Sequence, residues 1–414
     1  MDASFETLFN FQIKEKYLTK REICYDASYP FHYDPFRYEK YLAYKEKKIQ
    51  KKESTSLISL PIFSFSFPYL YYSSCFELEN TLENYLEANH SLMSVFSISK
   101  QDVFNPNNEI FRSFLYSELE GSLNIENVPT TRKRVRELLD DHLKIENRND
   151  QIIKNMKAGI DFVLTKPAFN KENLRHLYSL LSDGCLDQEN LLRDGDYYRY
   201  DEVEVDGYPG CSSKDLEGAM NSLLDFVNES LKKKKYTVLL PFFAHYALVY
   251  YHPYFDYNGR TARMVSFWIS LLEDTLFVPL FSEAINSTKS KYYLALEESR
   301  NNHNDITFFL LYLLRVSSRY CFLYMDIENL KEKGIYLTGT EQSYLRKIVM
   351  KASEKFTYID FLSYAGIDIS KQGALKILNH FLSLKILKAS VLNKTKFFEV
   401  NKSCFPLSSS LPKE

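Results

Sequence analysis

Apolar side chains recur every three or four residues through two long stretches of this sequence, residues 131–164 and 213–235. This spacing places them on one face of a helix, and both stretches are longer than ordinary strands. Glycine and proline, which interrupt helices, number only 12 and 13 among 414 residues. The sequence therefore predicts a mainly α chain, long enough for roughly two to three domains.

Charge and cysteine usage exclude several classes of protein. The chain has 52 Lys and Arg against 54 Asp and Glu, so its net charge of -2 gives no global attraction to nucleic acid or to an acidic membrane. Six scattered cysteines without a Cys-x-x-Cys pair predict reduced thiols in the cytoplasm and no zinc site. Residues 54–76 and 236–255 are uncharged, but their prolines and polar residues suit a bilayer helix poorly, so we expect no membrane span.

The chain divides into three parts and a bridge. Residues 1–95 are rich in Tyr, Lys and Phe, and the segment LISLPIFSFSFPYLYY predicts strands, but this region suggests no chemistry and its role is unknown. Residues 96–325 carry the helical patterns. Residues 326–340 are a predicted linker, which leads to a compact module at residues 341–402.

The module at residues 341–402 predicts three helices followed by a β-hairpin. This order resembles a winged helix, with residues 371–387 in the position of the recognition helix. Residues 340–402 hold 11 Lys and Arg against 5 Asp and Glu, a local charge of +6. That charge is compatible with DNA as a partner. The favoured interpretation is a module for dimerisation or protein docking, whose lysines only solvate a helix.

The sequence concentrates its chemistry at residues 252–263, His-Pro-Tyr-Phe-Asp-Tyr-Asn-Gly-Arg-Thr-Ala-Arg, after an apolar helical stretch. A second helix is predicted to begin near Asn258, and its first amides would point a partial positive charge into the preceding loop. Arg260 and Arg263 share a face of its first turn, where cations are stable if a polyphosphate neutralises them. The loop therefore predicts an anion site.

Two further residues of this loop suggest a reaction at the bound anion. Asp256 can hold Mg²⁺ through a carboxylate oxygen. His252 has a pKa near enough to neutrality to accept a proton from a hydroxyl.

The run 252–263 resembles the motif H-P-F-x-[D/E]-G-N-G-R-x-x-R of the Fic family. The identical positions are His252, Pro253, Asp256, Asn258, Gly259, Arg260 and Arg263. Residues 195–209 resemble the flap hairpin of the family, and residues 117–121, Ser-Glu-Leu-Glu-Gly, resemble the inhibitory helix of certain members. The resemblance covers residues 96–325 and implies a Fic-type helical core with a small β-hairpin flap.

The resemblance implies a protein adenylyltransferase that moves AMP from Mg-ATP to a Tyr, Thr or Ser hydroxyl of a target protein, and that can also remove AMP. His252 would be the general base, and Asp256 would bind Mg²⁺. The amides of Asn258 and Gly259, together with Arg260, would hold the phosphates.

The resemblance also implies regulation of this site. Arg263 would hold the γ-phosphate, and Glu120, from an inhibitory helix near residues 113–121, would pair with the same arginine and compete with ATP. We expect a cytoplasmic homodimer whose partners are ATP, a target protein and, through the winged helix, DNA.

Tyr257 departs from the family pattern, which has Gly or Ala between the acid and Asn258. If this position needs a positive φ, a tyrosine is strained there and its ring can crowd the phosphate. The alternative function is therefore a DNA-binding regulator whose degenerate Fic domain binds nucleotide or dimerises without transferase activity.

Overall fold

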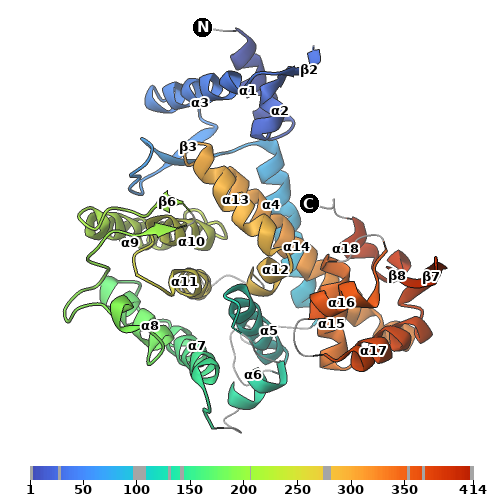
Figure 1. The fold of residues 1–414 in the computed structure, drawn as a ribbon. Coiled ribbons are helices and arrows are strands. Elements are labelled where there is room, and N and C mark those ends of the chain that lie inside the picture. The colour runs from blue at the N-terminus through green and yellow to red at the C-terminus, as the bar shows by residue number, and fades with distance from the viewer. Residues whose placement is uncertain are drawn as a thin grey trace.

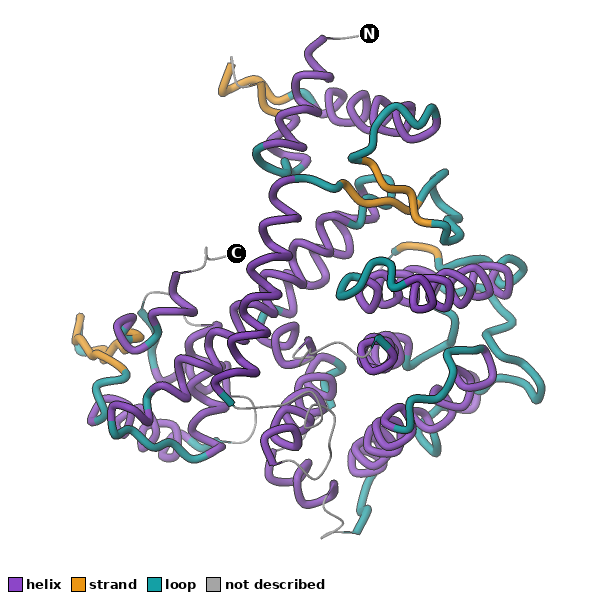
Figure 2. Tube along the Cα trace, turned by 180° about the vertical axis from the view of Figure 1, so that it is seen from behind, coloured by secondary structure: helices purple, strands orange, loops and turns teal. Residues whose placement is uncertain are grey.

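The structure is a computed structural model that describes residues 3–26, 29–96, 109–128, 132–139, 144–205, 207–273, 281–351, 355–365 and 369–410. These residues are mainly helical, as predicted, and their strands form four two-stranded antiparallel hairpins (Figures 1 and 2). Figure 1 shows the N-terminal helices at one end of the molecule and the C-terminal module at another, with the helical core between them.

The N-terminal region contains helices and two of the hairpins. Its elements are α1 (Ala3–Lys14), α2 (Lys20–Cys24), β1 (Tyr25–Asp26), β2 (Tyr29–Tyr33), α3 (Pro35–Gln50), β3 (Leu57–Leu60) and β4 (Leu70–Ser73). β3 and β4 pair within the segment where strands were predicted, so that prediction is confirmed. A buried ion pair, from Lys45 Nζ to Asp305 Oδ2 at 2.5 Å, ties α3 to the helical core.

The core follows, and it contains most of the helices. Its elements are α4 (Phe76–Val95), α5 (Glu109–Ile125), α6 (Arg132–Leu139), α7 (Arg148–Leu164), α8 (Lys171–Ser182), η1 (Gln188–Asn190), β5 (Glu204–Val205), β6 (Tyr208–Pro209), α9 (Leu216–Lys233), α10 (Leu240–Tyr251), α11 (Asn258–Leu272), α12 (Phe281–Ser287), α13 (Lys289–Asn301) and α14 (Thr307–Asn329). The stretch 131–164 forms two helices, α6 and α7, because Asn147 caps a new one by accepting the Asp150 amide at 3.1 Å.

α10 and α11 lie at the centre of this core and pack against each other. Nearly every side chain of both helices is buried, and α10 accordingly shows no amphipathic pattern. The long helices α4 and α14 run side by side (Figures 1 and 2). α5 packs against α12 near the start of α11. Because α10 and α11 are both buried in the core, they fix the two ends of the loop that connects them.

The C-terminal module has the element order that the sequence predicted. It comprises η2 (Lys331–Lys333), α15 (Gly339–Lys351), α16 (Tyr358–Ala365), α17 (Lys371–Ser383), β7 (Leu387–Leu392), β8 (Thr395–Val400), η3 (Lys402–Cys404) and α18 (Pro406–Ser410). Phe356 pairs with Phe398 of β8 through two backbone hydrogen bonds of 2.9 and 2.7 Å. α14 extends to Asn329, into the predicted linker. The winged-helix assignment stays a prediction.

Candidate active site

The loop between α10 and α11 carries the predicted catalytic residues. α10 ends at Tyr251, and His252 follows with left-handed backbone angles (φ 53°, ψ 62°) while its amide still donates to Leu248. α11 begins at Asn258. The end of one buried helix and the start of the next therefore bring His252 into the same short loop as the α11 amides.

The His252 imidazole is half-buried and neutral. Burial, together with the positive charges of Arg199 and Arg300, lowers the pKa of His252 to about 4. Its Nδ1 atom is buried and has no hydrogen-bond partner among the described residues. The side chain is therefore in the form that accepts a proton at neutral pH.

Arg199 joins this loop to the predicted flap. The flap hairpin is present, with Glu204 opposite Pro209 in β5 and β6. Arg199 is 2% exposed; its Nε donates to the His252 carbonyl at 2.8 Å, and its Nη2 donates to the carbonyl of Cys211, just after the hairpin. One guanidinium thus fixes the base of the flap against the backbone of His252.

The start of α11 presents unbonded amides towards the loop. The first helical hydrogen bond runs from the Thr261 amide to the Tyr257 carbonyl at 2.9 Å, so the amides of residues 258–260 have no acceptor within the helix. The Asn258 side chain accepts from the Tyr254 amide at 2.9 Å and donates to the Tyr254 carbonyl at 2.8 Å. These two hydrogen bonds fix the conformation of the loop. The free amides at the start of α11 can therefore bind an anion.

Arg260 is a buried cation at this helix start. The residue is 8% exposed, and its Nε and Nη1 atoms are buried without a hydrogen-bond partner among the described residues. Buried polar groups are normally satisfied, so two unsatisfied donors on one guanidinium fit an anion that the protein itself does not supply.

Tyr257 has the left-handed backbone that its place in the motif suggested, with φ 65°. Its ring is 3% exposed and lies against the Arg260 guanidinium, with Cζ 3.9 Å from the ring centroid. The strain of a tyrosine at positive φ is therefore offset by ring burial and a cation–π contact.

Arg263 is already paired with a carboxylate, that of Glu126, the first residue after the end of α5. Its Nη2 donates to Glu126 Oε1 at 2.5 Å, and its Nε donates to Ser122 Oγ at 2.9 Å. Burial alone would raise the pKa of the Glu126 carboxyl, but the charge of Arg263 and its hydrogen bond outweigh burial and lower it. Glu126 is consequently ionised at neutral pH.

Glu120 does not make the pair that was predicted for it. Its Oε1 lies 3.3 Å from Lys347 Nζ on α15, while Glu126 holds Arg263. Two residues along a helix rotate a side chain by about 200°, so Glu120 and Ser122 point to nearly opposite sides of α5. The prediction that Glu120 pairs with Arg263 is therefore wrong.

The sequence reasoning missed Glu126 and Ser122, the two residues that contact the Arg263 side chain. Ser122 lies in the last turn of α5, and Glu126 is the first residue after this helix ends at Ile125. The sequence did contain a signal for the true end of α5. Asn127 follows Glu126, Asn is a common residue at the left-handed end of a helix, and Asn127 has φ 55° in the structure. The sequence analysis predicted that this helix ends near residue 121, about one turn too early.

Asp256 is the predicted metal ligand. Its carboxylate is exposed, and Oδ1 accepts the Tyr257 amide at 2.6 Å, which leaves Oδ2 directed to solvent or a ligand. The described part of the chain contains no cluster of three or more His, Cys, Asp or Glu suited to a metal. A lone carboxylate fits Mg²⁺ that arrives with a polyphosphate, because such sites commonly use one or two carboxylates and the phosphate oxygens.

Comparison with known proteins agrees with this geometry. The sequence model of the Fic/DOC family matches residues 133–270, a range that includes the loop and all of its predicted site residues. These residues form a Fic domain. Ser122 and Glu126 precede the matched range, so their contacts with Arg263 reach the Fic domain from outside it.

Relatives and solved structures extend the comparison beyond the Fic domain. The chain is 30% identical over 122 residues to Protein adenylyltransferase Fic of Nematostella vectensis, covering 30% of this chain and 27% of the relative. It is 24% identical over 216 residues to the Drosophila willistoni protein of that name, covering 51% and 41%. The chain thus spans less than half the length of either relative.

The structural similarity to a solved Fic family protein from Desulfovibrio desulfuricans G20 covers more of this chain than the sequence matches do. That protein superposes with a TM-score of 0.50 at 16% sequence identity, and the match covers 83% of this chain and 98% of that one. The similarity therefore supports the fold around the Fic domain. Within the described residues, no helix combines the length and the apolarity needed to cross a bilayer.

Proposed function

We propose that this chain transfers AMP from ATP to a hydroxyl side chain of a protein. The observation that carries the proposal is the pairing, in one loop, of a neutral His252 with a helix start where the buried Arg260 has two donors, Nε and Nη1, without a hydrogen-bond partner among the described residues. The matched relatives named protein adenylyltransferase support the same reaction type. Removal of AMP from the target is a further prediction from the family resemblance.

Each residue of the loop has a defined role in the proposed reaction. His252 accepts the proton of the attacking hydroxyl, whose oxygen bonds to the α-phosphorus as the bond to the β-phosphate breaks and pyrophosphate leaves. The amides of Asn258 and Gly259 with Arg260 hold the phosphates in line for this attack. Asp256 would hold Mg²⁺, which neutralises phosphate charge when bound. Positioning and charge neutralisation supply most of the rate enhancement in phosphoryl transfer, and this loop offers both.

We further propose that Glu126 holds the enzyme in an inhibited state. A Cβ at residue 259 would lie 2.6 Å from Oε1 of Glu126, so this carboxylate sits directly on the second residue of α11. A carboxylate here repels a triphosphate and occupies Arg263, the predicted γ-phosphate ligand. Release of Glu126 would then be required before ATP binds productively.

Labelled ATP tests the proposed function. Protein with Mg²⁺ and ATP labelled at the α-phosphate should become labelled when Glu126→Gly removes the inhibitory carboxylate, whereas ATP labelled at the γ-phosphate should leave no label. Adding His252→Ala to the same variant should abolish incorporation. Absence of α-label in Glu126→Gly, or label that survives loss of His252, would contradict the proposal.

The C-terminal module supports a second function, regulation through DNA. Lys371, Lys376, Lys385 and Lys388 are all exposed on or beside α17. Lys347 of α15 contacts Glu120 of α5, the helix that leads to Glu126. A ligand on the module could therefore act on the inhibitory helix. A gel-shift assay with duplex DNA, with and without ATP, tests this alternative, and the homodimer and the cytoplasmic location stay predictions.

A further inference from the structure

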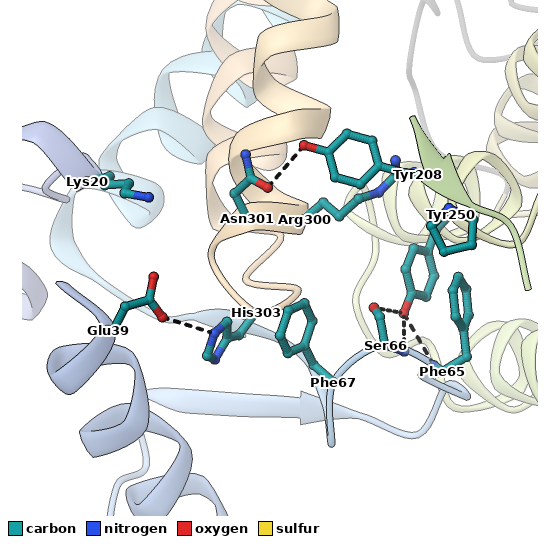
Figure 3. Close-up of a pocket in the computed structure, with 11 residues that line it drawn as sticks. Lys20, Glu39, Phe65, Ser66, Phe67, Tyr208, Tyr250, Arg300, Asn301 and His303 are labelled. Atoms are coloured by element: carbon teal, nitrogen blue, oxygen red, sulfur yellow. Dashed lines mark hydrogen bonds and ion pairs between the residues drawn. The ribbon is translucent and has the colours of Figure 1, made fainter. Parts of the chain in front are cut away.

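A cleft of about 490 Å³ lies between the N-terminal region and the core (Figure 3). Its walls come from α2, α3, residues 65–67, the flap strand β6 and the ends of α10 and α13. Pockets of this size commonly hold small ligands or a few side chains. The loop site and its nucleotide residues do not line it, so the cleft needs its own explanation.

Two cations in this cleft lack a counter-ion. No carboxylate among the described residues lies within 4 Å of Lys20 Nζ or of the Arg300 guanidinium, which instead contact aromatic rings. Glu298 is within electrostatic range of Lys20 but accepts a hydrogen bond from Asn302 at 3.2 Å. Neither cation is therefore held in an ion pair with a carboxylate of the described residues.

The acidic residue of the cleft is already engaged. Glu39 Oε2 lies 3.9 Å from Nε2 of His303, and Glu46 Oε1 lies 2.6 Å from Nδ1 of the same ring. Figure 3 shows Glu39 directed towards His303. Among the residues that line the cleft, the two cations Lys20 and Arg300 therefore outnumber the single carboxylate, Glu39.

Stacked aromatic side chains make the cleft walls rigid. Phe65 stacks on Tyr250 and Phe67 stacks on His303, each with ring centroids 4.3 Å apart. The Tyr250 hydroxyl is 2.6 Å from Ser66 Oγ, which fixes the loop between the two rings. A preformed wall loses little entropy when a ligand binds.

The cleft adjoins the proposed site of AMP transfer. Tyr208 and Pro209 belong to the flap, and Tyr250 stands two residues before His252. The Arg300 charge contributes to the lowered pKa of His252, so the two side chains lie within electrostatic range. A peptide with its hydroxyl at His252 would pass the flap and reach this cleft.

We propose that the cleft binds an acidic segment of the target protein, adjacent to the hydroxyl that receives AMP. The inference rests on the proposed function for the identity of the target, but the binding itself needs no AMP transfer. Arg300 and Lys20 supply the complementary charge, and the stacked rings supply the apolar surface beside it.

Peptide binding without ATP tests the cleft. The probes are two fluorescein-labelled peptides, the acidic GEEYEEG and the basic GKKYKKG, measured by fluorescence anisotropy with the full chain at low salt. We expect the acidic peptide to bind more tightly, and Lys20→Glu and Arg300→Glu each to weaken it by about three- to tenfold. Lys232→Glu, a charge reversal at an exposed position outside the cleft, should change its affinity by less than twofold.

Three outcomes would overturn the inference: equal binding of the two peptides, an affinity insensitive to both cleft variants, or a single-stranded DNA probe that binds the cleft more tightly than the acidic peptide. The α-label assay in Glu126→Gly separates the two proposals. Binding of the acidic peptide without any incorporation of label would support the proposal for the cleft and contradict AMP transfer. Equal labelling of both peptides, unchanged in both cleft variants, would support AMP transfer and contradict the proposal for the cleft.

Discussion

Glu126 Oε1 lies 2.5 Å from Nη2 of Arg263, and the two residues are 137 positions apart in the chain. The contact joins the end of α5 to the second turn of α11, and Ser122 adds a hydrogen bond to the same guanidinium at 2.9 Å. α5 is held in turn by α12, where Glu118 accepts the Ser282 amide. The Arg263 side chain is therefore held by residues outside the matched range.

Removing this carboxylate should activate the enzyme. A charge-assisted hydrogen bond of this kind contributes about 1.5–3 kcal/mol, so Glu126→Gly should raise the initial rate of AMP incorporation by roughly ten- to a hundredfold at matched ATP. Glu120→Gly is the control, since Glu120 contacts Lys347 instead. A faster Glu120→Gly with an unchanged Glu126→Gly would return the inhibitory role to Glu120.

Loss of the proposed base should affect chemistry and not nucleotide binding. In the Glu126→Gly background, His252→Ala should lower AMP transfer by about 10²- to 10⁴-fold, the usual contribution of a general base. ATP affinity by calorimetry should stay within a few fold, because the imidazole acts on the incoming hydroxyl. His90→Ala, at an exposed position on α4, serves as the matched control. Unchanged turnover without His252 would exclude it as the base.

The imidazole of His252 should titrate at a lower pH than an exposed histidine, because the side chain is largely buried. The pKa is lowered to about 4, so the charged imidazole should appear only as pH falls through that value, whereas an ordinary histidine titrates near 6.5. NMR of protein labelled at histidine Cε1 measures this directly, and the signal absent from His252→Ala assigns the residue. A midpoint near 6.5 would mean that burial and the neighbouring arginines do not act on this ring.

The ring of Tyr257 should support nucleotide binding. Tyr257→Gly relieves the positive φ but removes the surface against which Arg260 lies, a contact worth about 0.5–2 kcal/mol. In the Glu126→Gly background, Mg-ATP should then bind about two- to thirtyfold more weakly, while Tyr257→Phe keeps the ring and the affinity. Tighter binding by Tyr257→Gly would show instead that the ring crowds the phosphates.

The contacts of residues 252–263 could be predicted because they are local. His252, Asp256, Asn258 and the two arginines belong to one loop and one helical turn, so their spacing alone brings them together. The helical class and the order of elements in the C-terminal module also followed from periodicity, since an apolar stripe must be buried.

The contact between Glu126 and Arg263 and the cleft depended on tertiary structure. Spacing along α5 permits either Glu120 or Glu126 as the partner of Arg263, and only the packing of α5 against α12 decides which face meets α11. The cleft gathers Lys20, Tyr208 and Arg300 from separate segments whose distances no local pattern encodes. The sequence by itself determined the groups that make up the loop, because neighbours in a helix or turn are fixed by backbone geometry. The fold decided what faces them, because that choice depends on how whole helices pack.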